Sequence, residues 1–217
     1  MEIYFKKIAE LHKTIFIKIK LLQVAFETLI SSYIENKIGI CNLFVSEKLG
    51  IQLKTNLLAL HEKKLMIAAG TGNVEKLVFD KLVRSDSIYW LDRQHADKYE
   101  NEFLDLMDDF ISYLNLTCYT GITGCEFHYT LYEAGSFYKK HIDQFQNNES
   151  RKFSMISYLN KDWVVEDGGQ LMIHQSNSEQ EITPTNGKTI FFKSNELPHE
   201  VLVTNKQRVS ITGWLTS

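Results

Sequence analysis

The segment 132–143, which reads YEAGSFYKKHID, decides the fold of this chain. Its residues His141 and Asp143 stand two positions apart, and side chains at positions i and i+2 of a strand project to the same face. His199 follows a proline and opens another apolar run, so it would bring a second imidazole from a different strand. Two imidazoles and one carboxylate on one side of a metal ion leave coordination positions open, which is the usual arrangement for non-heme Fe(II). We therefore expect His141, Asp143 and His199 to be metal ligands.

A His-x-Asp pair alone is weak, because so short a motif also occurs by chance. Three features strengthen it. Tyr132 and Tyr138 precede the pair at a spacing that puts two phenols near the mouth of the site, and the alternative is that they are ordinary strand tyrosines. His199 opens a strand, where a ligand is held rigidly, although a surface histidine is the alternative. Arg208 begins a strand in which polar residues alternate with apolar ones, so its side chain is placed toward the interior.

A guanidinium inside a protein needs an anionic partner, because a buried unpaired charge is costly. The carboxylate of a 2-oxo acid co-substrate would suit the planar fork of Arg208. The alternative is a structural pair between Arg208 and an aspartate or glutamate of the chain.

Composition limits the class of protein. The 217 residues, 44% of them hydrophobic, suffice for one domain or for one domain with a helical extension. The net charge of −3 gives no basic surface, so we expect no nucleic-acid partner. The three cysteines, Cys41, Cys118 and Cys125, lack CxxC spacing, which argues against a disulfide framework and a thiolate zinc site and fits a reducing cytoplasm.

The N-terminal region is charged throughout, so we expect neither a signal peptide nor a membrane partner. Its most apolar part, Ile15–Ile30, contains Lys18, Lys20 and Glu27 and predicts an amphipathic helix, with binding to a membrane surface as the lesser alternative.

Hydrophobic periodicity predicts two kinds of structure in succession. The first half has helical spacing at 22–33, 46–64 and 96–113, with short strands at 39–44 and 84–90 and a turn at 70–73. From about Gly124 the period changes to two. The predicted strands are Glu126–Tyr132, Tyr138–Ile142, Lys152–Leu159, Gln170–His174, Lys188–Phe192, His199–Thr204 and Arg208–Leu215.

This order predicts an α+β fold, with a double-stranded β-helix core of the jelly-roll or cupin-like kind braced by N-terminal helices. We divide the chain into an N-terminal helical extension (1–21), a helical support region with short strands (22–123) and the β-helix core (124–217), with 22–217 forming one catalytic domain.

Among the other histidines, His128 shares strand parity with Tyr132, so it is a candidate pocket residue rather than a ligand. We expect His12, His61 and His95 to be solvated, His174 to end a strand, and Asp108-Asp109 to lie on an exposed helix face.

Further short motifs surround the candidate ligands. They are Leu60-His-Glu-Lys63, Ala69-Gly-Thr-Gly-Asn73, Arg84-x-Asp86-x-Ile88-x-Trp90, Met107-Asp-Asp109, Tyr158-Leu-Asn-Lys-Asp-Trp163, Gly168-Gly169, Phe191-Phe192, Pro198-His-Glu-Val201 and Arg208-x-x-Ile211-Thr-x-Trp214. With these motifs, residues 22–217 resemble the prolyl-hydroxylase-domain family, the oxygen-sensing hydroxylases of hypoxia-inducible factor and their bacterial relatives.

The resemblance implies an Fe(II)- and 2-oxoglutarate-dependent dioxygenase. Such an enzyme uses O2 to hydroxylate a prolyl residue in a protein and converts 2-oxoglutarate to succinate and CO2, commonly with ascorbate as the reductant of oxidised iron. His141, Asp143 and His199 match the iron ligands, while Arg208 and Tyr158 match the residues that bind the distal carboxylate of 2-oxoglutarate. The resemblance also assigns Tyr132, Thr212, Trp214, Ile156 and Leu171 to the co-substrate pocket and Tyr138 to the substrate mouth.

Three departures from the pattern of the family lie near where a peptide substrate would dock. The chain looks one residue shorter than animal relatives between Tyr132 and His141, its turn Ser194–Leu197 is shorter and less basic, and it stops at Ser217 without the C-terminal helix of the animal enzymes. Hydroxylation of a free amino acid, a small peptide or a biosynthetic intermediate is therefore the alternative, and a non-enzymatic metal-binding barrel is a less favoured one. Nucleic-acid dealkylation of the AlkB type is disfavoured because Trp214 stands where that class has a second arginine.

Overall fold

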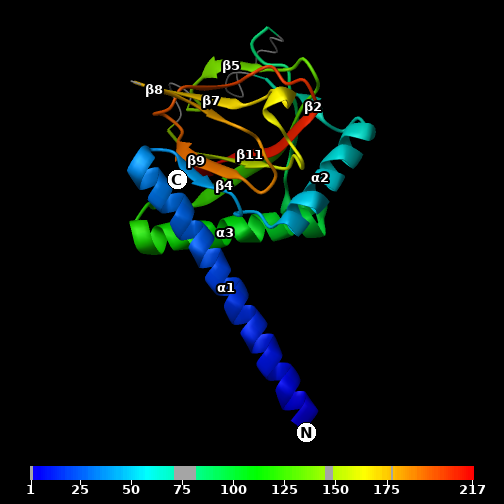
Figure 1. Ribbon diagram of the computed structural model, residues 1–217, viewed down its shortest axis with the longest axis vertical. Coiled ribbons are helices and arrows are strands. Elements are labelled where there is room, and N and C mark those ends of the chain that lie inside the picture. The colour runs from blue at the N-terminus through cyan, green and yellow to red at the C-terminus, as the bar shows by residue number, and fades with distance from the viewer. Residues whose placement is uncertain (1, 71–81, 145–148, 177) are drawn as a thin grey trace.

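The computed structural model describes residues 2–70, 82–144, 149–176 and 178–217. Two β-sheets enclose the interior of the domain, and the helices gather on the side of the larger sheet (Figure 1). The helices are α1 (Glu2–Asn36), α2 (Glu47–Glu62) and α3 (Lys98–Cys118), with short 3-10 turns at Arg93–His95 and Val165–Asp167. The strands are β1 (Gly39–Cys41), β2 (Ile67–Ala68), β3 (Ser87–Trp90), β4 (Gly124–Tyr132), β5 (Tyr138–His141), β6 (Arg151–Tyr158), β7 (Leu171–Gln175), β8 (Ser178–Ile182), β9 (Thr189–Lys193), β10 (His199–Val201) and β11 (Arg208–Thr216).

All paired strands are antiparallel. The larger sheet has the order β1-β9-β6-β11-β4-β3-β2, and the smaller has the order β5-β10-β7-β8. At the centre of the larger sheet, β11 pairs along its whole length with β4, with Arg208 opposite Tyr132 and Thr212 opposite His128. Two antiparallel sheets built from strands that alternate between them form the double-stranded β-helix that the sequence predicts, so the α+β fold class is confirmed.

Helices α2 and α3 begin where capping residues stand. Ser46 accepts a hydrogen bond from the backbone N–H of Leu49, and the carboxylate of Asp97 accepts from the first turn of α3. Each helix then places one apolar stripe against the larger sheet. The buried residues of these stripes are Leu49, Leu53 and Leu57 in α2 and Phe103, Met107, Phe110 and Leu114 in α3. Together with Phe26 of α1 they form the main hydrophobic core.

Helix α1 is one continuous element of 35 residues, which corresponds to about 50 Å at 1.5 Å per residue. Its C-terminal part packs on β1 and β9, and its N-terminal part projects away from the domain (Figure 1). The predicted boundary between residues 21 and 22 therefore falls inside a continuous helix, and the division into domains stays a prediction. Within the described residues, none of the helices combines the length and the apolarity that crossing a bilayer requires.

The structure differs from the predicted elements in several places. Strand β8 (Ser178–Ile182) was not predicted, and neither was the two-residue strand β2. Strand β10 ends at Val201 rather than at Thr204, and β5 ends at His141, so Asp143 lies in the loop that follows. Of the predicted turn at 70–73, positions 71–73 lie outside the described residues.

The minor histidines mostly follow expectation. His12 and His95 are exposed, as predicted, but His61 is only half-exposed and forms an ion pair with Glu133. His174 lies within β7 rather than at its end, and its two ring nitrogens lie 2.8 Å from carboxylate oxygens of Glu179 and Glu200. Asp108 and Asp109 are exposed on α3, as predicted.

Candidate metal centre

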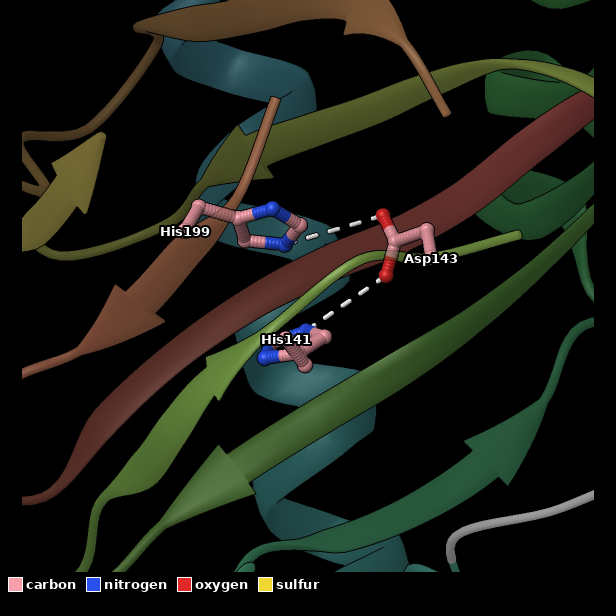
Figure 2. A group of neighbouring side chains, drawn as sticks. All are labelled: His141, Asp143 and His199. Atoms are coloured by element: carbon pink, nitrogen blue, oxygen red, sulfur yellow. Dashed lines mark ion pairs between the residues drawn. The ribbon is translucent and has the colours of Figure 1, made fainter. Parts of the chain in front are cut away.

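The three predicted ligands come together between the two sheets. His141 is the last residue of β5, and His199 is the first residue of β10, directly opposite it in the smaller sheet. Asp143 reaches the same point from the loop after β5, and Figure 2 shows the three side chains converging. One potential ligand atom from each residue lies within 4.8 Å of the other two. His141 Nε2 is 3.5 Å from Asp143 Oδ1, and His199 Nε2 is 3.7 Å from Oδ2. Among the described residues this is the one such cluster of histidine, cysteine and acidic side chains.

Both imidazoles are oriented by their second ring nitrogen. His141 Nδ1 lies 2.7 Å from the carbonyl oxygen of Lys139, and His199 Nδ1 lies 3.0 Å from that of Leu197. Because a carbonyl oxygen only accepts, each Nδ1 must carry the proton and donate it. Each Nε2 is then free to bind a metal ion. The ring of Tyr138 stacks on His141 at a centroid distance of 3.6 Å and so fixes its plane.

The charge state of the cluster suits a divalent cation. Burial lowers the pKa of His199 to about 4, so its imidazole is neutral at physiological pH. Burial alone would raise the pKa of Asp143, but His199, His141 and a hydrogen bond from Ser154 outweigh that effect and lower the pKa below its usual range. The site thus offers a neutral imidazole and a carboxylate in the forms that metal ions bind. Imidazole and carboxylate donors without any thiolate fit Fe(II).

Arg208, the first residue of β11, is deeply buried in the same interior. Its side chain is only 1% exposed, and its Nε donates to the carbonyl oxygen of Gly169 at 2.8 Å. The rings of Tyr132 and Tyr158 flank the guanidinium, with centroids at 5.0 and 5.1 Å. In the part of the chain that the structure describes, no carboxylate lies within ion-pair distance of Arg208. The alternative of a structural Arg–carboxylate pair is therefore not found there.

Tyr158 supplies a second polar group beside Arg208. Its hydroxyl is buried and has no hydrogen-bond partner of acceptable geometry among the described residues. Burial raises the pKa of Tyr158 to about 12, although the nearby Arg208 opposes the shift, so the phenol is a hydrogen-bond donor at neutral pH. Among the described residues, a guanidinium without a carboxylate partner lies beside a phenol without a hydrogen-bond partner, and together they fit a bound carboxylate such as the distal end of 2-oxoglutarate.

Most of the predicted pocket residues line one cavity of about 40 Å³. Tyr158 is not part of this lining, but its ring lies beside Arg208. A larger groove of about 1040 Å³ runs outside the barrel between the end of α1 and the β7–β8 hairpin, and it contains none of the three candidate ligands. The cavity lining comprises His141, Asp143, His199, Arg208, Tyr132, Tyr138, Ile156, Leu171, Thr212 and Trp214, together with His128, Thr130, Val201 and Arg84.

Sequence reasoning assigned no role to several residues near the centre. Arg84 forms an ion pair with the buried Asp86 at 2.6 Å, and its guanidinium lies 4.6 Å from the ring of Tyr138. The i, i+2 spacing of these opposite charges in a short apolar segment was a usable signal. Ser154, which donates to Asp143, was not predicted, and nothing in the local sequence marks it.

The comparisons with known proteins agree with this geometry. A profile of the 2OG-Fe(II) oxygenase superfamily matches residues 127–216, which contain all three candidate ligands and Arg208. The part of the chain that contains the candidate site thus matches a 2OG-Fe(II) oxygenase domain, in agreement with the class inferred from the motifs.

Within that class, the chain is 30% identical to human Egl nine homolog 1 over 201 residues, covering 82% of this chain and 44% of the relative. The rat protein of the same name is 28% identical, with 55% of its length covered, so the chain spans about half the length of these curated relatives. A Pseudomonas putida prolyl-4-hydroxylase structure is similar with a TM-score of 0.81 and 27% identity, over 88% of this chain and 99% of that one. A Trichoplax adhaerens prolyl hydroxylase, solved with a hypoxia-inducible factor peptide fragment, shares the fold with a TM-score of 0.80, 24% identity and 92% coverage of both chains.

Proposed function

We propose that this protein is an Fe(II)- and 2-oxoglutarate-dependent dioxygenase that hydroxylates a prolyl residue in a protein or peptide. The observation that carries the proposal is the convergence of His141, Asp143 and His199 in the cavity that also contains Arg208, a buried cation without a described carboxylate partner. Similarity to the Pseudomonas putida prolyl-4-hydroxylase along almost its whole length supports prolyl hydroxylation in particular.

Each part of the cavity has a defined task in this proposal. His141, Asp143 and His199 would hold the iron, which when bound supplies the O2 activation that couples decarboxylation of 2-oxoglutarate to hydroxylation. Arg208 and Tyr158 would bind the distal carboxylate of 2-oxoglutarate and thereby orient its 2-oxo acid end toward the ligands. The cavity is narrow, so the lining side chains would have to move apart as the co-substrate enters.

The remaining lining residues shape the space around these groups. The apolar side chains of Ile156 and Leu171 would exclude water from the reacting region. Tyr132 would contact the end of 2-oxoglutarate nearest the ligands, with Thr212 and Trp214 beside it, and Tyr138 would lie next to the bound substrate. The substrate would present a proline, and O2 would be the second substrate.

Ascorbate is proposed as the reductant that returns oxidised iron to Fe(II), because the relatives of this class commonly use it. We also propose a cytoplasmic location. The three cysteines are all free, and thiols persist in a reducing compartment.

The test uses the purified chain with Fe(II), ascorbate and 2-oxoglutarate. We expect formation of succinate, and we expect proline-containing candidate peptides from the host to gain one oxygen atom, detected by mass spectrometry. His141→Ala and Asp143→Ala should abolish both products, while His12→Ala, an exposed histidine on α1, should leave them unchanged. Full turnover in either ligand variant would refute the assignment of the ligands.

A further inference from the structure

Asp143 is the one candidate ligand that no strand holds. It follows β5 and lies in a loop, so strand geometry does not fix its carboxylate as it fixes the two imidazoles. Its orientation must come from neighbouring groups. The side chain is 10% exposed and sits against β6 of the larger sheet, where the fully buried Ser154 lies.

Ser154 makes a short hydrogen bond to this carboxylate. Its Oγ donates to Asp143 Oδ2 at 2.6 Å, a length typical of a hydroxyl bound to an ionised acceptor. Ser154 Oγ also lies 3.0 Å from Ser194 Oγ, and Ser194 is likewise fully buried. A hydroxyl has a single proton, and the anionic carboxylate is the stronger acceptor for it. The Ser194 hydroxyl is then left to donate to Ser154 and so completes the chain Ser194–Ser154–Asp143.

The backbone supports the same arrangement. The carbonyl oxygen of Ser194 accepts a hydrogen bond from the N–H of Gln144, the residue after Asp143, at 3.2 Å. The N–H of Ser194 in turn donates to the carbonyl oxygen of Lys152, two residues before Ser154 in β6. The loop that carries Asp143 is thus tied to the end of β9 and to β6 through both its main chain and its side chain.

We propose that Ser154, supported by Ser194, is a positioning residue for the metal centre. Asp143 Oδ1 lies 3.5 Å from His141 Nε2 and Oδ2 lies 3.7 Å from His199 Nε2, but only Oδ2 is engaged by the Ser154 hydroxyl. The hydrogen bond would therefore favour binding of an ion through Oδ1 alone, so that the carboxylate uses one coordination position and not two. A carboxylate that binds through one oxygen would leave one more coordination position for small molecules than a carboxylate that binds through both. This inference rests on the metal site in the proposed function.

Cobalt(II) binding to the full chain tests the proposal without turnover. Co(II) is titrated calorimetrically, and its visible absorption spectrum reports the geometry of its ligands. Because removal of a group that orients a metal ligand typically weakens binding 10- to 100-fold, we expect about that loss for Ser154→Ala, together with a changed spectrum. Ser194→Ala should lose less, because Ser154 still donates. Ser154→Thr, which keeps the hydroxyl, should recover affinity and spectrum.

Ser157→Ala is the matched control. Ser157 is on the same strand and equally buried, and its hydroxyl lies 2.8 Å from Thr189 Oγ1, away from the ligands. This variant should bind Co(II) as the wild type does, and thermal unfolding of the metal-free proteins should show similar losses for Ser154→Ala and Ser157→Ala. An unchanged dissociation constant and spectrum in Ser154→Ala, or an equal weakening in Ser157→Ala, would overturn the proposal. If the wild type neither bound Co(II) nor formed succinate, the proposed function would fail, and this inference with it.

Discussion

Replacing Arg208 with Met separates the stability cost of a buried cation from its use in binding. The side chain is 1% exposed and is held by one hydrogen bond to Gly169, with no carboxylate partner among the described residues. Exchange of a buried ion pair for apolar residues of similar size is often neutral or stabilising by about 1–4 kcal/mol, and a buried cation without a carboxylate partner lacks even the attraction that offsets its desolvation. Loss of the bond to Gly169 offsets about 1–3 kcal/mol of that gain. We therefore expect Arg208→Met to be as stable as the wild type, or slightly more stable, without co-substrate.

Binding of 2-oxoglutarate, in contrast to stability, should become much weaker in Arg208→Met. Removal of one partner from a buried, hydrogen-bonded charge pair costs about 2–5 kcal/mol, which raises the dissociation constant about 30- to 4000-fold. A ligand present at 100 times its dissociation constant stabilises the folded state by about 2.7 kcal/mol, or roughly 5–11 °C in Tm for a chain of this size. In Arg208→Met the same concentration should contribute less than about 0.9 kcal/mol.

The assay is thermal unfolding with Mn(II) in place of iron, with and without 2-oxoglutarate. Arg93→Met is the control, because Arg93 forms an exposed ion pair with Asp105 and does not line the cavity, and its shift should match that of the wild type. An Arg208→Met protein that keeps the full shift would refute the role in co-substrate binding. A large loss of stability without 2-oxoglutarate would refute the view that Arg208 is an unpaired buried charge.

Three further predictions concern the scaffold and its titration. Gly213→Ala should destabilise the protein by about 3 kcal/mol or more in urea unfolding, because a Cβ there would clash with the carbonyl oxygen of Glu126 on β4. A loss below about 1 kcal/mol would contradict this packing. Burial lowers the pKa of His128 to about 4, so between pH 6.5 and 4 the unfolded chain takes up a proton that the folded chain does not. The free energy of unfolding should therefore fall by up to roughly 3 kcal/mol as the pH is lowered through that window, and the fall should be smaller in His128→Gln. Identical pH profiles of stability in the wild type and in His128→Gln would contradict the lowered pKa of His128. Iodoacetamide at pH 8 should modify the exposed Cys118 before Cys125, because burial raises the pKa of Cys125 to about 11. If peptide mapping showed that Cys125 is modified first, the burial of Cys125 would be disproved.

The sequence sufficed for the parts of the fold that local patterns encode. Alternating apolar residues located β4, β6, β9 and β11, and capping chemistry located the start of α2 at Ser46. Strand β8 was not predicted, because its sequence, SEQEI, has almost no apolar pattern. It is an edge strand whose regularity comes from pairing with β7, and such tertiary pairing leaves no periodic signal.

In the candidate site, too, some residues could be predicted from local sequence and others depend on the tertiary fold. His141, Asp143 and His199 are residue types that bind metals, and a motif marks two of them, so chemistry alone picked them out. Ser154 and Ser194 are common residues with no motif, and only the register of β6 against β9 brings their hydroxyls together beside Asp143. Likewise, whether Arg208 has a carboxylate partner depends on which aspartate and glutamate side chains the fold places near it.

The two ends of the candidate site are carried by different sheets. His141 and His199 belong to the smaller sheet, whereas Arg208 and Tyr158 belong to the larger one. If the proposed function holds, the spacing between the sheets would favour one carbon-chain length of a 2-oxo dicarboxylic acid, because the acid has to reach both ends. Homologues of 2-oxoglutarate that are one methylene shorter or longer would be rejected by the architecture itself. Substitutions in the apolar layer between the sheets would then alter this discrimination without touching either end.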